Sequence, residues 1–86
     1  MPQLTVTVTT QGTQNTLIHI DSMDVSQGGK FTVGTGAHSL HWWFAGNSGG
    51  TLNISVSPLS DGSTLQIADV ISPSYAFEAG DEKFQI

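Results

Sequence analysis

The serine at the centre of residues 46–50, Gly-Asn-Ser-Gly-Gly, is the first candidate for chemistry in this chain. Gly46, Ser48 and Gly50 match the G-x-S-x-G pattern around the nucleophilic serine of many hydrolases. That nucleophile sits between a strand and a helix. Here residues 51–56 alternate apolar and polar side chains, as a strand does. We therefore interpret residues 46–50 as a flexible hairpin loop whose glycines permit positive φ, and we expect no catalytic serine.

The same five residues also match the serine motif of trypsin-like proteases. Such a protease needs a histidine and an aspartate upstream of the serine, in contact with each other. His19 and Asp21 precede Ser48, but residues two apart on a strand point the same way and cannot form a relay. A chain of 86 residues is also too short for the two barrels of that fold. We expect a protein that is not an enzyme.

The three histidines and the acids near them in sequence are candidates for metal binding. His38 and His41 are three apart, so on a strand they point to opposite faces and cannot share an ion. His19 and Asp21 share a face, and Asp24 is near in sequence. These three could hold a divalent ion weakly, but no fixed motif supports it. The prediction is a solvated edge strand with no metal and no cofactor.

Two adjacent tryptophans suggest a different kind of site. Neighbouring strand residues point to opposite faces, so one ring would enter the core and the other would face outward. Folding residues 39–45 and 52–57 into a hairpin about Ser48 makes one face entirely apolar and the other polar except for Trp43. The apolar pairs are Phe44–Leu52, Trp42–Ile54 and Leu40–Val56, and the others are Trp43–Asn53, His41–Ser55 and Ser39–Ser57.

The polar face of this hairpin carries the predicted ligand-binding residues, which are Trp43, His41, Asn53 and Ser55. An aromatic plate beside short neutral hydrogen-bonding groups suits a sugar, so the leading interpretation is a lectin-like, carbohydrate-binding module. One alternative is a structural module that docks on a protein or self-associates into a homo-oligomer, with Trp43 covered by another strand or subunit. Another is a small, toxin-like secreted β protein.

Charge and composition exclude several partners. The chain has only two strong bases, Lys30 and Lys83, against seven acids, for a net charge of −5. It therefore lacks the cations that nucleic acid or anionic lipid would require. Residues 1–3 do not resemble the start of a signal peptide, and no transmembrane segment is visible. We expect a soluble domain without cysteine whose compartment the sequence leaves open.

The hydrophobic pattern indicates the fold. Period-two alternation in 4–9, 16–21, 31–33, 39–45 and 52–57, separated by Gly-rich turns, predicts an all-β domain. Residues 64–71 fit a strand with a bulge or a short helix, and residues 75–78 and 83–86 would form a last hairpin turning at 79–82. About seven short strands over residues 1–86 predict one small antiparallel β-sandwich, Ig-like or jelly-roll-like.

The predicted core follows from the same alternation. It consists of Leu4, Val6, Val8, Ile18, Ile20, Phe31, Val33, Leu40, Trp42, Phe44, Leu52, Ile54, Val56, Leu65, Ile67, Phe77 and Phe84. Residues 36–42, Gly-Ala-His-Ser-Leu-His-Trp, resemble the glycine, histidine and alternating-strand segments of many Ig-like bacterial domains. That resemblance implies an Ig-like sandwich and carries no functional residue with it.

Overall fold

The computed structural model describes residues 2–72 and 76–86, and it confirms an all-β fold. Six strands form one antiparallel sheet, and the described residues contain no helix. No helix capable of crossing a membrane occurs in this part of the chain. The strands are β1 (Gln3–Ile20), β2 (Met23–Asp24), β3 (Gly29–Thr32), β4 (Ala37–Ser57), β5 (Leu65–Val70) and β6 (Phe77–Gln85).

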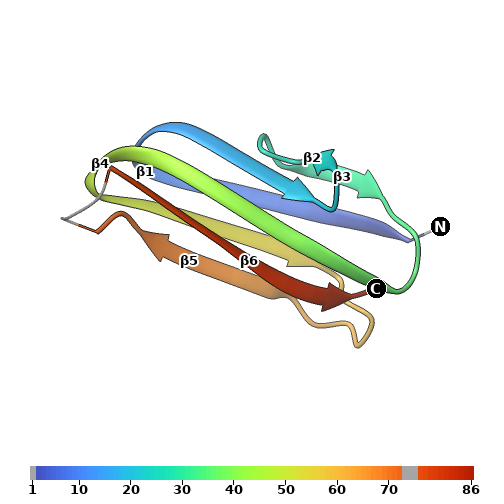
Figure 1. The fold of residues 1–86 in the computed structure, drawn as a ribbon. Coiled ribbons are helices and arrows are strands. Elements are labelled where there is room, and N and C mark those ends of the chain that lie inside the picture. Colours follow the sequence, from blue (N-terminus) through green and yellow to red (C-terminus); the bar gives the residue numbers. More distant parts are fainter. Residues whose placement is uncertain (1, 73–75) are drawn as a thin grey trace.

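The two longest strands double back on themselves. β1 has 18 residues and β4 has 21, which at roughly 3.3 Å per residue would extend about 60 and 70 Å. The molecule measures only 40 × 18 × 18 Å, so neither strand can be straight. Figure 1 shows both turning at the end of the molecule farthest from the chain termini.

The doubled strands divide the sheet into two arms. Residues 5–11 of β1 pair with 51–57 of β4, and together with residues 3–4 of β1, β3 and β5 they form what we call the β5 arm. Residues 15–20 of β1 pair with 40–45 of β4, and with β2 and β6 they form the β6 arm. The two arms run side by side in Figure 1.

A single hydrophobic core joins the arms. Buried side chains from both arms of β1 and β4 belong to one cluster, because every second residue of each arm points inward. Its buried members are Leu4, Val6, Ile18, Ile20, Val25, Val33, Leu40, Phe44, Leu52, Ile54, Val56, Ile71 and Phe84. Eleven of these were predicted, while Val25 and Ile71 were missed. Five further predicted residues pack against the cluster while partly exposed, namely Val8, Phe31, Trp42, Leu65 and Ile67.

The strand count and the central hairpin differ from prediction. Six strands lie in one sheet where about seven in a two-sheet sandwich were expected, because residues 11–15 and 46–50 are bends inside continuous strands. The register of β1 on β4 shifts twice at the bend, between Gln11 and Asn15. The predicted pairing of 39–45 with 52–57 is therefore wrong, since each segment has β1 as its neighbour.

The C-terminal hairpin prediction is also wrong. Its first residue, Tyr75, lies outside the described residues, but residues 77–85 form one strand paired along β4. Gly80, expected in a turn, lies opposite Trp42. A Cβ built on Gly80 would collide with Trp42 Cζ2 and stand 2.7 Å from Cε2, so the glycine makes room for the indole. Phe77, predicted in the core, is 50% exposed.

The ambiguous segment 64–71 contains strand β5, whose six residues pair with β4 without a bulge. Its burial alternates throughout, so Asp69 points inward and Val70 outward. Asp69 tolerates this position because its Oδ2 accepts a hydrogen bond of 3.0 Å from Trp42 Nε1. Trp42 belongs to the β6 arm and Asp69 to the β5 arm, so this bond ties the arms together on the side where β5 and β6 face each other.

Candidate binding surface

The outer face of the β6 arm is a lattice of side chains from β1, β4 and β6. These side chains point outward because they alternate with the buried Ile18, Ile20, Leu40 and Phe44. Directly paired residues share a face, so the register gives three adjacent rows. They are Asn15–Ala45–Phe77, Leu17–Trp43–Ala79 and His19–His41–Asp81.

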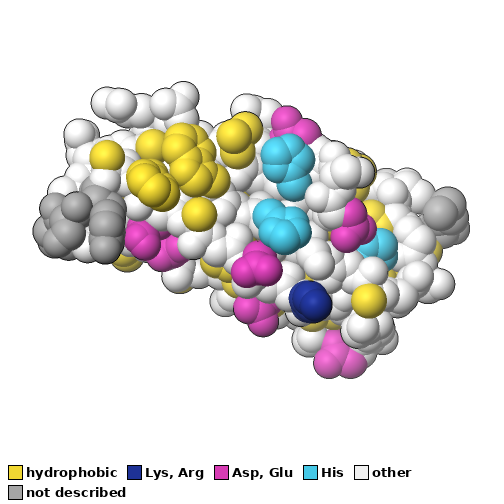
Figure 2. Space-filling model, viewed as in Figure 1, with side chains coloured by type: hydrophobic (Ala, Val, Ile, Leu, Met, Phe, Trp, Pro, Cys, Tyr) yellow, Lys and Arg dark blue, Asp and Glu magenta, His cyan; other side chains and the backbone are white. Residues whose placement is uncertain are grey.

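Apart from Asn15 at one end, the first two rows form an apolar surface that we call the Trp43 patch, which comprises Leu17, Trp43, Ala45, Phe77 and Ala79. The rings of Trp43 and Phe77 are tilted by 31° with centroids 6.2 Å apart, a favourable aromatic geometry. Leu17 and Phe77 are each 50% exposed. Figure 2 shows apolar side chains gathered on this face, with histidines beside them.

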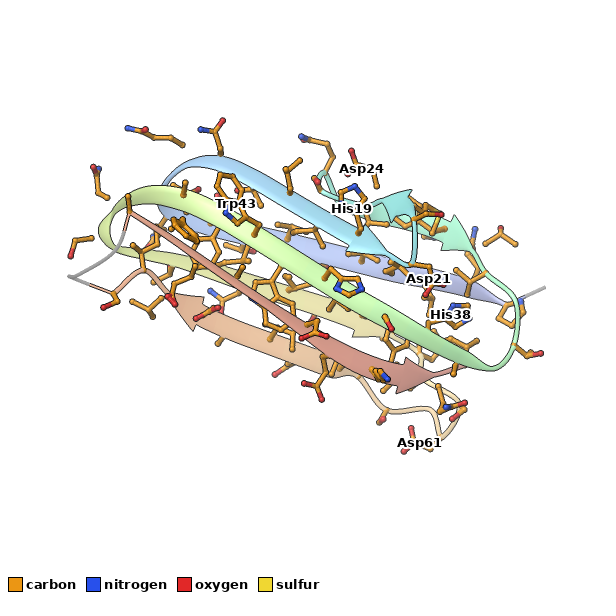
Figure 3. All side chains as sticks on the ribbon, in the orientation of Figure 1. His19, Asp21, Asp24, His38, Trp43 and Asp61 are labelled. Carbon is orange, nitrogen blue, oxygen red and sulfur yellow. The ribbon has the colours of Figure 1, made fainter. Side chains whose placement is uncertain are left out.

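The third row, His19–His41–Asp81, is a line of hydrogen-bonding groups beside the Trp43 patch, and we call it the polar row. Paired residues on neighbouring strands have Cβ atoms about 4.5–5.5 Å apart. His41 and Asp81 are exposed and His19 is partly exposed. Figure 3 shows His19 and Trp43 along the same side of the ribbon. An apolar plate and a row of donors and acceptors therefore lie side by side.

The four predicted ligand-binding residues do not come together. Trp43 and His41 lie on the outer face of the β6 arm, as their alternation predicted. Asn53 and Ser55 lie on the β5 arm, where Asn53 pairs with Thr9 and Ala68, and Ser55 with Thr7 and Gln66. The bend at 46–50 separates the two pairs, because it directs the two halves of β4 into different arms.

Sequence reasoning missed six residues of this surface, which are Leu17, His19, Ala45, Phe77, Ala79 and Asp81. His19 and Leu17 do alternate with Ile18 and Ile20, so their outward direction could have been read. Their position beside Trp43 depends on the pairing of β1 with β4, which alternation does not specify. Phe77 and Asp81 were misplaced because the sequence predicts a turn at residues 79–82, where the structure has a continuous strand.

Asp21 and Asp24, which were considered with His19 as weak metal ligands but not predicted as a site, each have hydrogen-bond partners within the protein. Asp21 contacts His38, with 2.7 Å between Oδ2 and Nδ1, and its Oδ1 accepts a bond from the Ser39 backbone N–H. Asp24 Oδ1 accepts bonds from the backbone N–H and the hydroxyl of Ser26. Within residues 2–72 and 76–86, no group of three His, Asp or Glu could hold a metal ion. Figure 3 shows Asp21 facing His38, away from Asp24.

Each ring nitrogen of His38 faces a hydrogen-bond acceptor. Its Nδ1 faces the Asp21 carboxylate, and its Nε2 lies 2.7 Å from the Gly34 carbonyl oxygen. Both ring nitrogens must then donate, which requires the imidazolium form. The bond to Asp21 and then the bond to Gly34 raise the pKa of His38 above its usual 6.5. The bonds from His38 and the Ser39 N–H lower the pKa of Asp21 below its usual 3.8.

This ion pair predicts a pH dependence of folding. His38 contributes fully below pH 6.5, and its contribution is lost as pH rises through its raised pKa. Asp21 contributes fully above 3.8, and its contribution is lost as pH falls through its lowered pKa. The pair should therefore stabilise most between these values. In urea unfolding, the wild type should lose stability as pH rises above 6.5, and His38→Gln should lose less over the same rise. Parallel pH profiles of the two proteins would contradict this assignment.

Ser48 is exposed at the bend of β4, with strand on both sides. The predicted strand-to-strand setting is thus confirmed, and the absence of a serine hydrolase activity stays a prediction. Comparison with protein-family models, with curated proteins and with solved structures found no significant match.

Proposed function

We propose that the protein is a non-enzymatic binding module that recognises carbohydrate through the outer face of the β6 arm. The observation that carries the proposal is the Trp43 patch lying directly beside the polar row, in register across three strands. In this proposal, the two arms of the folded sheet act as the two layers of a small antiparallel sandwich, and each layer has its own outer face.

The chemistry of sugars fits this arrangement. A pyranose ring presents C–H groups on its face and hydroxyls around its rim. Trp43, with Phe77 beside it, would lie against the C–H face, where an aromatic ring contributes a large contact area. His19, His41 and Asp81 would exchange hydrogen bonds with hydroxyls at one edge of the ring. Ligand sites commonly combine apolar lining with a few polar groups in this way.

A second candidate function is self-association through the same face. The observation in its favour is that Leu17 and Phe77, on either side of Trp43, are each 50% exposed. Contiguous apolar patches rimmed by polar residues are typical of protein interfaces. The module would then bury the Trp43 patch against a second copy, and Trp43 would be the anchor of that interface.

The test is a titration with neutral cello-, laminari- and manno-oligosaccharides, followed by NMR of the two indole N–H groups. Trp42 Nε1 is already bonded to Asp69, so its signal serves as an internal reference. We expect the Trp43 signal to shift with at least one of these sugars, and Trp43→Ala to weaken that binding by at least about tenfold. Trp43→Phe should retain part of the affinity, because it keeps an aromatic plate.

Val70→Ala is the matched control, since Val70 is 54% exposed but lies on the β5 arm. It should bind sugar as the wild type does. Light scattering across a concentration series separates the two candidate functions. A dimer that Trp43→Ala dissociates, together with no response to any of the sugars, would replace carbohydrate binding by self-association.

A further inference from the structure

A shallow groove lies on the outer face of the β5 arm. It contains Asn53 and Ser55, the two predicted ligand-binding residues that the structure places away from Trp43. Its volume is ≈ 370 Å³, and Thr7 and Thr9 of β1, Asn53 and Ser55 of β4, and Gln66 and Ala68 of β5 line it. The register orders these side chains into two adjacent rows, Thr7–Ser55–Gln66 and Thr9–Asn53–Ala68. We call it the Asn53 groove.

The lining of this groove is uncharged although the chain carries a net charge of −5. Solvated surfaces usually carry Lys, Glu or Asp, which interact favourably with water. The Asn53 groove instead offers three hydroxyls and two amides, each able to donate and to accept a hydrogen bond. An ionic ligand would find no opposite charge there, whereas a polyhydroxylated neutral ligand would find a partner for each hydroxyl.

We propose that the Asn53 groove is a second carbohydrate site, which binds a neutral glycan chain through hydroxyls and amides. This inference rests on the proposed function of the Trp43 face for the class of ligand, but it concerns a different surface. The groove has no aromatic plate, so its affinity is lower than that of the Trp43 face. Because the two surfaces lie on different arms, one domain can hold two glycan chains and cross-link them.

The experiment uses the same titrations, with the side-chain amide signals of Asn53 and Gln66 as reporters of the groove. In the wild type we expect these amides to shift with the sugar that shifts the Trp43 indole. Trp43→Ala removes the indole reporter together with the aromatic ring, and it should leave the amide response unchanged. Ser55→Lys places an ammonium between Thr7 and Gln66, and it should weaken the groove response at least about tenfold while sparing the indole response.

Ser60→Lys is the matched control, because it adds the same charge to an exposed loop outside both surfaces. It should leave both responses unchanged. With hydroxyethyl cellulose, a long neutral β-1,4-glucan, the wild type should raise turbidity by cross-linking, whereas Trp43→Ala and Ser55→Lys should each fail to do so.

The outcomes separate the two proposals. An indole response without any amide response in the wild type would overturn the second site and leave the proposed function standing. Amide shifts that persist at full strength in Ser55→Lys would also overturn it, because the shifts would then arise elsewhere. An amide response without an indole response would support the groove and overturn the role proposed for Trp43.

Discussion

Replacing Trp42 by alanine should destabilise the fold by about 3 kcal/mol, the lower end of the range for buried aromatic residues, since the ring keeps some exposure. The indole lies over Gly80 and packs against the core, and its N–H donates to Asp69 on the opposite arm. The substitution therefore removes packing and leaves an inward-pointing carboxylate without this partner. Urea unfolding followed by far-ultraviolet circular dichroism would measure the loss.

The neighbouring Trp43 provides the matched control. It is the same residue type on the same strand, but it faces outward and contacts Phe77 rather than the core. Trp43→Ala should cost much less than Trp42→Ala at low protein concentration. Trp42→Phe should lie between them, because it keeps most of the packing but loses the hydrogen bond to Asp69. Equal losses for the two alanine variants would mean that the assignment of the two rings to opposite faces is wrong.

The two rings illustrate what the sequence could predict. Alternation fixes the face on which a side chain lies, and this held for the inward Leu40 and Phe44 and for the outward His41 and Trp43. Alternation says nothing about which strand lies alongside. Residues 39–45 and 52–57 are complementary to each other, yet they are equally complementary to β1, which is the neighbour of both.

The errors at the C-terminus have a related cause. Gly80 is followed by Asp81 and Glu82, and such a composition is typical of a turn. Sequence alone does not distinguish it from a strand in which the glycine makes room for an indole ring. The uncertainty between a bulged strand and a short helix at residues 64–71 had a similar origin, because the apolar alternation of Leu65 and Ile67 is not continued at Asp69. Asp69 faces inward because Trp42, 27 residues away, supplies its hydrogen bond, and no local pattern reports such a contact.

For the same reason, only two of the four predicted ligand-binding residues share a face with each other on the β6 arm. Trp43 and His41 lie on one strand, so their shared face follows from spacing alone. Asn53 and Ser55 belong to the same strand β4, and a flat hairpin would have placed them beside Trp43. Leu17 and Phe77 reach the Trp43 patch through pairing with distant segments, which a single sequence does not reveal.

The two proposed binding surfaces lie on different arms because β4 bends at residues 46–50. The second large prediction therefore concerns Gly46, the first residue of this bend. A Cβ at this position would collide with the Gly12 carbonyl oxygen and stand 2.7 Å from Thr13 Cα. Both are backbone atoms of β1, which cannot rotate aside as the end of a side chain can. Gly46→Ala must therefore push β1 and β4 apart where both strands turn. Overpacking of this kind costs about 1–3 kcal/mol, and more where the backbone is fixed.

Gly34→Ala is the control, because no heavy atom lies within 4 Å of its added Cβ. Gly34 also lies outside the positive-φ region, so alanine should be neutral there, or stabilising by about 0.4–1 kcal/mol through the lower entropy of the unfolded chain. Urea midpoints of the two variants should thus move apart, with Gly46→Ala alone falling well below the wild type. If both alanines were tolerated equally, β1 and β4 would not touch at this point. The bend that directs Trp43 and Asn53 to different arms would then have a different structure from the one described.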